Sequence, residues 1–172
     1  MRTPRHKLEQ RWSAIKNERS SFITHWREIS DYVMPRSARF YKTDRNRGGK
    51  KHNAIFDNTG SQALKILAAG MMAGMSSPAR PWFRLSLSDD DLMENPSVKV
   101  WLADTQRRML NVFARSNTYL TLHSVYEELA AFGTSAVIMM DDFERTIHHY
   151  HSPIGEFGIA TNYKGDVNTC YR

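Results

Sequence analysis

Hydrophobic side chains recur at alternating spacings of three and four residues in the first part of the chain. They are Leu8, Trp12, Ile15, Phe22, Trp26, Ile29 and Val33, and Arg19 occupies the one polar gap in the period, between Ile15 and Phe22. This period is typical of a helix with one apolar stripe, about 28 residues long. Pro35 is expected to end the helix, because a proline disfavours helical geometry in the residue before it.

Three further helices are predicted downstream from the same kind of period. They begin near Asp57–Thr59, at Asn95-Pro96 and near Thr118, and their apolar positions run to about Met75, Phe113 and Phe132. Asn95 before Pro96 is the usual order of an N-cap and a first helical residue. Gly133 stands where a glycine commonly follows a helix. Between the first two of these helices, Trp82–Leu87 alternates like a short strand.

After Gly133 the pattern changes to one typical of strands. Short apolar or alternating runs cover Ser135–Met140, Thr146–His151, Phe157–Ala160 and Val167–Tyr171. The turn-forming residues Asn162–Asp166 separate the last two. The pattern predicts an antiparallel meander of about four strands. Its last strand has no partner to close it, which predicts the front part of a longer protein.

These elements predict an α+β fold, in which four helices precede a small antiparallel sheet. The chain divides into a long helix over 1–35, a basic loop over 36–56, a helical region over 57–133 with the short strand near 82–87, and strands over 134–172. The last of these regions reads as an incomplete domain.

Composition narrows the class of protein. The 172 residues carry a net charge of +6 and are 41% hydrophobic, enough for a core. A single cysteine, Cys170, excludes an internal disulfide, and no apolar run approaches the roughly 18 residues of a membrane span. No signal peptide is recognisable. These features predict a soluble, reduced, cytosolic protein.

The charge is concentrated at one end. Residues 1–53 hold 14 Lys and Arg against 5 Asp and Glu, whereas residues 54–172 hold 10 against 13. The predicted loop contributes a run of cations, with Phe40 and Tyr41 among them: Arg36, Arg39, Lys42, Arg45, Arg47, Lys50 and Lys51. These side chains are candidates for contacts to DNA phosphates or to a neighbouring subunit, and a solvated loop is an equal alternative.

Candidate chemistry is sparse. Asp89–Asp91 and Asp141-Asp142 could serve Mg²⁺, but turn and helix-start roles are commoner for such residues. His149 and His151 would share one strand face without a third metal ligand, and Cys170 lacks the setting of a nucleophile. No phosphate-binding glycine loop is present. We therefore predict no catalytic residue, no metal and no cofactor.

Large aromatic residues mark candidate packing or subunit-interface positions. They are Trp12, Phe22, Trp26, Trp82 and Trp101. A first helix that binds a membrane surface is the alternative, although the other predicted helices offer apolar faces for it to pack against.

Several stretches, in their order and spacing, resemble the portal (head-to-tail connector) proteins of short-tailed bacteriophages, the podoviruses. They are Arg11-Trp12, Trp26–Arg36, Ile55–Thr59, Ala68–Pro78, Pro81–Leu85, Phe132–Thr134, Pro153–Phe157 and the ending from Gly165 to Arg172. No single stretch is diagnostic, but together they cover nearly the whole chain.

The resemblance implies a structural, non-enzymatic subunit of a ring, usually of about twelve copies. Such rings occupy one capsid vertex of the virion after assembly in the host cytoplasm. They conduct double-stranded DNA during packaging and ejection, and they dock terminase, the tail adaptor and capsid or scaffold proteins, with no membrane partner. Portal subunits are several times longer than this chain, which would correspond to their N-terminal portion, in the outer wing.

Two other functions remain open on the sequence. One is a small stand-alone nucleic-acid-binding protein that uses the basic loop over 36–51. The other is a Mg²⁺ nuclease built on Asp89–Asp91.

Overall fold

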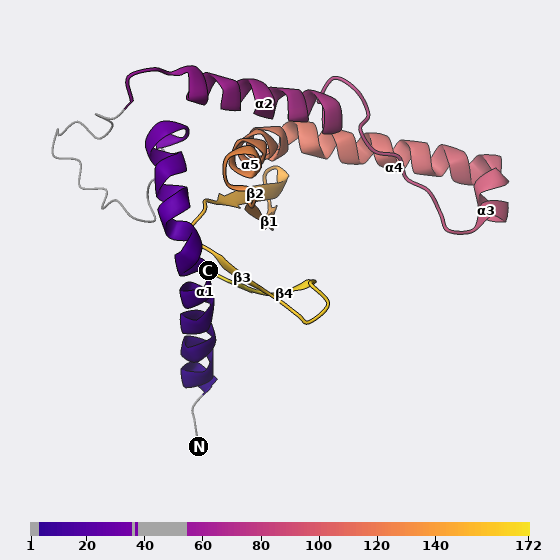
Figure 1. The fold of residues 1–172 in the computed structure, drawn as a ribbon. Helices are drawn as coiled ribbons and strands as arrows, with labels where there is room; N and C mark the ends of the chain where they lie inside the picture. The colour runs from indigo at the N-terminus through magenta and orange to yellow at the C-terminus, as the bar shows by residue number, and fades with distance from the viewer. Residues whose placement is uncertain (1–3, 36, 38–54) are drawn as a thin grey trace. The chain divides into compact units, whose positions relative to one another are not determined.

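The computed structural model describes residues 4–35, 37 and 55–172 (Figure 1). These residues form α1 (Pro4–Tyr32), α2 (Thr59–Met75), α3 (Asp90–Glu94), α4 (Pro96–Arg115), α5 (Thr118–Phe132), β1 (Ala136–Asp142), β2 (Thr146–Ser152), β3 (Gly158–Thr161) and β4 (Val167–Tyr171). The predicted α+β fold is confirmed, with one short helix more than expected.

The chain forms two compact units. The first comprises 1–65, 128–136 and 152–172, and the second comprises 66–127 and 137–151. Helices α2 and α5 each contribute residues to both units.

The N-terminal ends of α2 and α4 are capped by hydrogen bonds between side chains and the backbone. At α2, the Asp57 carboxylate accepts hydrogen bonds from the Thr59 backbone nitrogen (3.1 Å) and the Thr59 hydroxyl (2.6 Å). These bonds, led by that of the hydroxyl, lower the pKa of Asp57. At α4, Asn95 accepts from Ser97 N, and Pro96 is the first helical residue. The predicted starts of both helices are confirmed.

Gly133 follows α5 as predicted. Its φ of +74° is left-handed, and its backbone nitrogen donates to the Leu129 carbonyl over 2.9 Å. A residue with a β-carbon would be strained there, so glycine is the favourable choice.

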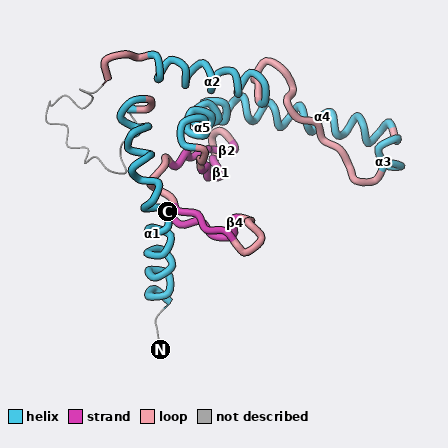
Figure 2. The backbone as a smooth tube through the Cα atoms, viewed as in Figure 1, coloured by secondary structure: helices cyan, strands magenta, loops and turns pink. Residues whose placement is uncertain are grey.

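The prediction of a short strand near 82–87 is wrong. Residues 81–87 belong to no helix or strand, and Figure 2 draws them as part of the connection between α2 and α3. Alternation produces a strand only where a partner strand supplies backbone hydrogen bonds. Here the aromatic side chains pack on a helix instead: the rings of Trp82 and Phe83 each lie 6.0 Å from that of Phe113 on α4, centroid to centroid.

The four predicted strands are present, but they form two separate two-stranded sheets, β1–β2 and β3–β4. In the second, Gly158 pairs with Tyr171 and Ile159 with Cys170, in antiparallel register. The predicted single meander is therefore wrong, because residues 153–157 interrupt the extended chain between β2 and β3. Gly155 has a φ of +95°, and Ile154 and Phe157 enter the core.

The core of the first unit is aromatic and aliphatic. Trp26, Ile154 and Phe157 are buried together, with Phe132 and Ala136 packed against them. Ser30 and Ser152 are almost fully buried, and their hydroxyls have no hydrogen-bond partner among the described residues. This core holds α1 and the segment before β3 together.

The second unit has a core with a polar bridge. Ala68 and Leu102 are buried in it, and the Ser76 hydroxyl lies 2.7 Å from the Tyr126 hydroxyl in the interior. None of the described helices combines the length and the apolar character that crossing a bilayer requires.

We predict that Gly158→Ala weakens the contact between α1 and β3. A β-carbon built on Gly158 would lie 2.7 Å from Ile15 Cγ2 and 2.8 Å from Trp12 Cζ3, so those side chains must move. Such overpacking costs about 1–3 kcal/mol, measurable by denaturant unfolding. Gly70→Ala is the control. Nothing lies within 4 Å of its β-carbon, and alanine should stabilise α2 by up to about 1 kcal/mol. Equal effects of the two changes would contradict the packing argument.

Candidate functional site

Arg19 is the polar centre of the first unit. It occupies the one polar gap in the apolar stripe of α1, and its Nη1 donates to the carbonyls of Phe157 (2.7 Å) and Gly155 (3.4 Å). The guanidinium carbon also lies 5.9 Å from the ring centroids of both Trp12 and Trp26. Burial lowers the pKa of Arg19 from its ordinary value, but an arginine stays charged at neutral pH. The cation therefore ties α1 to the segment before β3.

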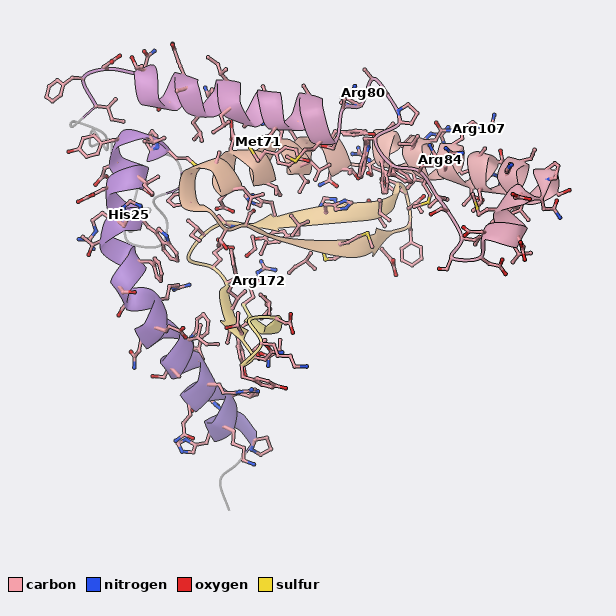
Figure 3. All side chains as sticks on the ribbon, turned by 45° about the vertical axis from the view of Figure 1, so that its right-hand side comes forward. His25, Met71, Arg80, Arg84, Arg107 and Arg172 are labelled. Atoms are coloured by element: carbon pink, nitrogen blue, oxygen red, sulfur yellow. The ribbon has the colours of Figure 1, made fainter. Side chains whose placement is uncertain are left out.

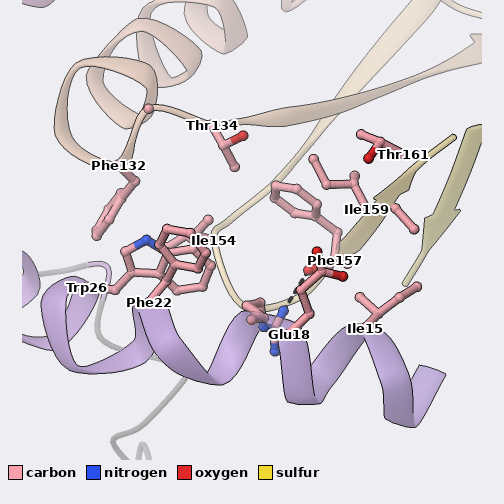
Figure 4. A pocket seen from close by; sticks show the side chains of 14 residues that line it. Ile15, Glu18, Phe22, Trp26, Phe132, Thr134, Ile154, Phe157, Ile159 and Thr161 are labelled. Atoms are coloured by element: carbon pink, nitrogen blue, oxygen red, sulfur yellow. Dashed lines mark hydrogen bonds between the residues drawn. The ribbon is translucent and has the colours of Figure 1, made fainter. Parts of the chain in front are cut away.

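Beside Arg19 lies a cavity of about 340 Å³. Its walls come from α1, the end of α5 with Gly133 and Thr134, and the segment through β3 (Figure 4). The apolar lining consists of Ile15, Phe22, Trp26, Phe132, Ile154, Phe157, Ile159 and Ala160, and Glu18, Arg19 and two threonines supply most of the polar atoms. The lining is thus mostly apolar and suits an apolar group better than a polar one.

A buried carboxylate holds one wall of this cavity in place. Glu128 on α5 is fully buried, and it accepts hydrogen bonds from the Ile154 backbone nitrogen (2.6 Å) and the Ser135 hydroxyl (3.0 Å). Glu128 is not among the residues predicted from the sequence to have a functional or packing role. A signal existed, because Glu128 falls on one helical stripe with Thr121, Val125 and Phe132, at spacings of four, three and four.

The five aromatic residues proposed for packing or interface roles fall in both units. In the first, Trp26 is buried, Phe22 stacks on it with ring centroids 6.1 Å apart, and Trp12 is half-buried with its ring 6.2 Å from that of Tyr171. Phe22 is nevertheless 55% exposed.

In the second unit, Trp82 is half-buried and its Nε1 donates to the Tyr119 hydroxyl (3.3 Å). Trp101 on α4 is 62% exposed. Phe22 and Trp101 thus offer aromatic surface to solvent, whereas Trp12, Trp26 and Trp82 are engaged within their own units.

Seven cations of the predicted basic loop are the candidates for contacts to DNA phosphates or to a neighbouring subunit. Arg36, Arg39, Lys42, Arg45, Arg47, Lys50 and Lys51 all lie outside the residues that the structure describes.

The two aspartate runs proposed for Mg²⁺, Asp89–Asp91 and Asp141-Asp142, supply carboxylates that accept hydrogen bonds from nearby backbone nitrogens. Asp89 accepts from the backbone nitrogens of Asp91 (3.0 Å) and Leu92 (3.3 Å) and is the N-cap of α3, a short helix that the sequence pattern did not predict. Asp142 accepts from the nitrogens of Glu144 and Arg145 in the turn between β1 and β2, and the bond from Glu144 is the main cause of its lowered pKa. Over 4–35, 37 and 55–172, no three His, Cys, Asp or Glu residues lie close enough together to hold a metal ion.

The histidines of β2 also have a structural setting. The Asn117 side chain pairs with the backbone of His149, accepting from its nitrogen (2.8 Å) and donating to its carbonyl (2.7 Å). Burial, followed by the charge of His148, lowers the pKa of His149 from its ordinary value. Asn117 was not singled out from the sequence, since nothing local marks its partner 32 residues away.

In the part of the chain that the structure describes, these side chains contribute packing surfaces and structural hydrogen bonds. Comparison with known proteins identifies the class: the family profile described as "Bacteriophage head to tail connecting protein" matches residues 5–172. The chain belongs to this family.

Two curated relatives match the same region. The chain is 55% identical over 170 residues to the "Probable portal protein" of Bordetella phage BPP-1, and 44% identical over 170 residues to the "Portal protein" of Salmonella phage epsilon15. Each match covers 99% of this chain and 31% of the relative. The chain therefore spans about a third of the length of these two relatives, and the resemblance to portal proteins seen in the sequence is confirmed.

Proposed function

We propose that the chain is the outer wing region, in the N-terminal portion, of a portal subunit that assembles into a ring of about twelve copies. The ring would occupy one vertex of the virion after assembly in the host cytoplasm. It would conduct double-stranded DNA during packaging and ejection, and dock terminase, the tail adaptor and capsid or scaffold proteins. Its role would be positional, without a reaction. The family match across 5–172, together with two relatives named as portal proteins, carries the proposal.

Exposed apolar side chains support a role in assembly. Near the start of α4, Val100 and Trp101 are 69% and 62% exposed, and Leu92 on α3 is half exposed. Exposed tryptophans are enriched among the residues that dominate binding energy at protein interfaces. We propose Trp101 as a contact to a neighbouring subunit, and the seven loop cations as a surface for an anionic partner.

Trp101→Ser, made in the complete gene product, should lower the association constant between neighbouring subunits at least tenfold. This corresponds to about 1.4 kcal/mol per subunit contact. Because Trp101 is exposed within the chain, the thermal unfolding midpoint of unassembled subunits should hardly move. Particle mass measured over a range of protein concentrations reports assembly. Lys99→Ser, on the same helix, is the matched control and should assemble normally. Wild-type protein that stays monomeric at every concentration would refute the ring, whereas rings of unchanged stability in the variant would refute only the assignment of Trp101.

A further inference from the structure

A second cleft, within the second unit, collects arginine side chains. It encloses about 270 Å³ between the C-terminal half of α4 and the turn that joins β1 to β2. Its lining residues are Arg108, Asn111, Val112, Arg115, Glu144, Arg145 and Thr146. Positions 108, 111, 112 and 115 follow the helical period, so one face of α4 forms one wall and the turn forms the other. We refer to it as the arginine cleft.

The guanidinium groups of this cleft are only partly neutralised. Arg108 donates from Nε to Asp104 Oδ2 over 2.7 Å, and Asp104 also pairs with Arg107. Arg115 and Arg145 form no ion pair and donate no side-chain hydrogen bond to any residue that the structure describes, although Glu144 lines the same cleft. Two complete sets of guanidinium donors therefore stand on opposite walls.

Nearby carboxylates do not cancel this charge. Asp104 accepts from two arginines, and Asp142 attracts Arg145 through space. Glu144 lines the cleft and has no ion pair with any residue that the structure describes. The lining itself holds the arginines at 108, 115 and 145 against the one carboxylate of Glu144, and the cleft keeps a positive excess.

Two backbone amides of the turn between β1 and β2 are already hydrogen-bonded, so its side chains are the groups that face a ligand. Asp142 Oδ1 accepts from the backbone nitrogens of Glu144 (2.8 Å) and Arg145 (3.4 Å), which occupies both groups. Thr146 has a φ of +75°, which a β-branched residue rarely adopts. Donors available to a ligand are consequently the guanidinium groups, the Asn111 amide and the Thr146 hydroxyl.

We propose that the arginine cleft binds a phosphate group. A guanidinium fork matches two phosphate oxygens, and a tetrahedral phosphate can accept from arginines on two walls at once. A planar carboxylate has only two oxygens for the same donors. The cleft is also large enough for the ester oxygens of a phosphodiester, so the source of the phosphate is either a DNA backbone or a small phosphate compound. This inference does not depend on the proposed ring, because inorganic phosphate by itself tests it.

The test compares wild-type chain with the double variant Arg115→Gln and Arg145→Gln. Inorganic phosphate is titrated at constant ionic strength, and NMR follows the backbone signals of Arg145 and Thr146. The matched control is Arg11→Gln with Arg84→Gln, which removes the same charge at exposed positions outside the cleft (Arg84 is labelled in Figure 3). Circular dichroism establishes that each variant is folded. If the double variant does not fold, the single variants Arg115→Lys and Arg145→Lys replace it, since they keep the charge but lose the fork.

We expect saturable shifts in the wild type and in the control, and at least a tenfold loss of phosphate affinity in the cleft variant. A parallel arm uses a short DNA duplex. If its phosphates are the source, the cleft variant should reduce the slope of log affinity against log salt by about 2, close to 0.9 for each lost contact. If the cleft variant loses inorganic phosphate binding but its salt slope for DNA is unchanged, the natural ligand of the cleft is a small phosphate compound. Absence of saturable shifts, equal loss in the control, or binding of polyglutamate in place of phosphate would overturn the proposal.

Discussion

Replacement of Glu128 by alanine is expected to lower the free energy of unfolding by about 3–5 kcal/mol, the largest effect of any substitution considered for this chain. Glu128 is fully buried and accepts from Ile154 N and the Ser135 hydroxyl. Alanine would leave both donors without this acceptor and would open a cavity in the core. Denaturant unfolding followed by circular dichroism measures the loss.

Two control variants distinguish the loss of the Glu128 hydrogen bonds from the general effect of a substitution in α5. Glu128→Gln keeps the volume and one acceptor oxygen, so its loss should be smaller, about 1–3 kcal/mol. Glu127→Ala removes the adjacent carboxylate, whose contact is a long 3.8 Å approach to His123, and should cost less than about 1 kcal/mol. Similar losses for Glu127→Ala and Glu128→Ala would show that the buried hydrogen bonds contribute little.

Arg19→Ala is expected to destabilise the first unit by about 2–4 kcal/mol. Hydrogen bonds from a charged donor contribute about 1.5–3 kcal/mol, and a cation over an aromatic ring adds about 0.5–1 kcal/mol at a partly exposed site. Arg19 makes both kinds of contact, to the Phe157 carbonyl and to the rings of Trp12 and Trp26. Loss of these contacts should also release α1, which limited proteolysis within α1 would detect.

Lys16 provides the control for Arg19. Its Nζ lies 5.2 Å from the Trp12 ring centroid, but the residue is exposed and it donates no side-chain hydrogen bond to the described residues. Lys16→Ala should therefore cost less than about 1 kcal/mol. Arg19→Lys, which keeps the charge but not the planar fork, should fall between the two. An Arg19→Ala variant no less stable than Lys16→Ala would refute the bridging role.

The helices were the predictable part of this fold, because their signals are local. The Asn95-Pro96 start of α4, the Asp57 cap of α2 and the glycine after α5 each act within a few residues. The stripe from Leu8 to Val33 similarly determines α1 through its own period.

The strand region shows the limit of the same reasoning. Short apolar or alternating runs located all four strands, yet such a pattern does not determine which strands pair with each other. Trp82–Leu87 alternates and pairs with nothing among the described residues, while Ile154 draws the chain into the core between β2 and β3. Pairing depends on which segments meet in space.

By itself the sequence determined four of the five helices in the described residues, the class of fold, the uneven charge and, through the order of its short motifs, the phage connector family. Only the tertiary structure decided the roles of Arg19, Glu128 and the arginine cleft. The reason is distance along the chain. Arg19 bonds a carbonyl 138 residues away and Glu128 a nitrogen 26 residues away, and no periodicity or propensity carries information across such separations. A buried charge is stabilised by the groups that the fold brings to it, so its role becomes visible only when those groups are in place.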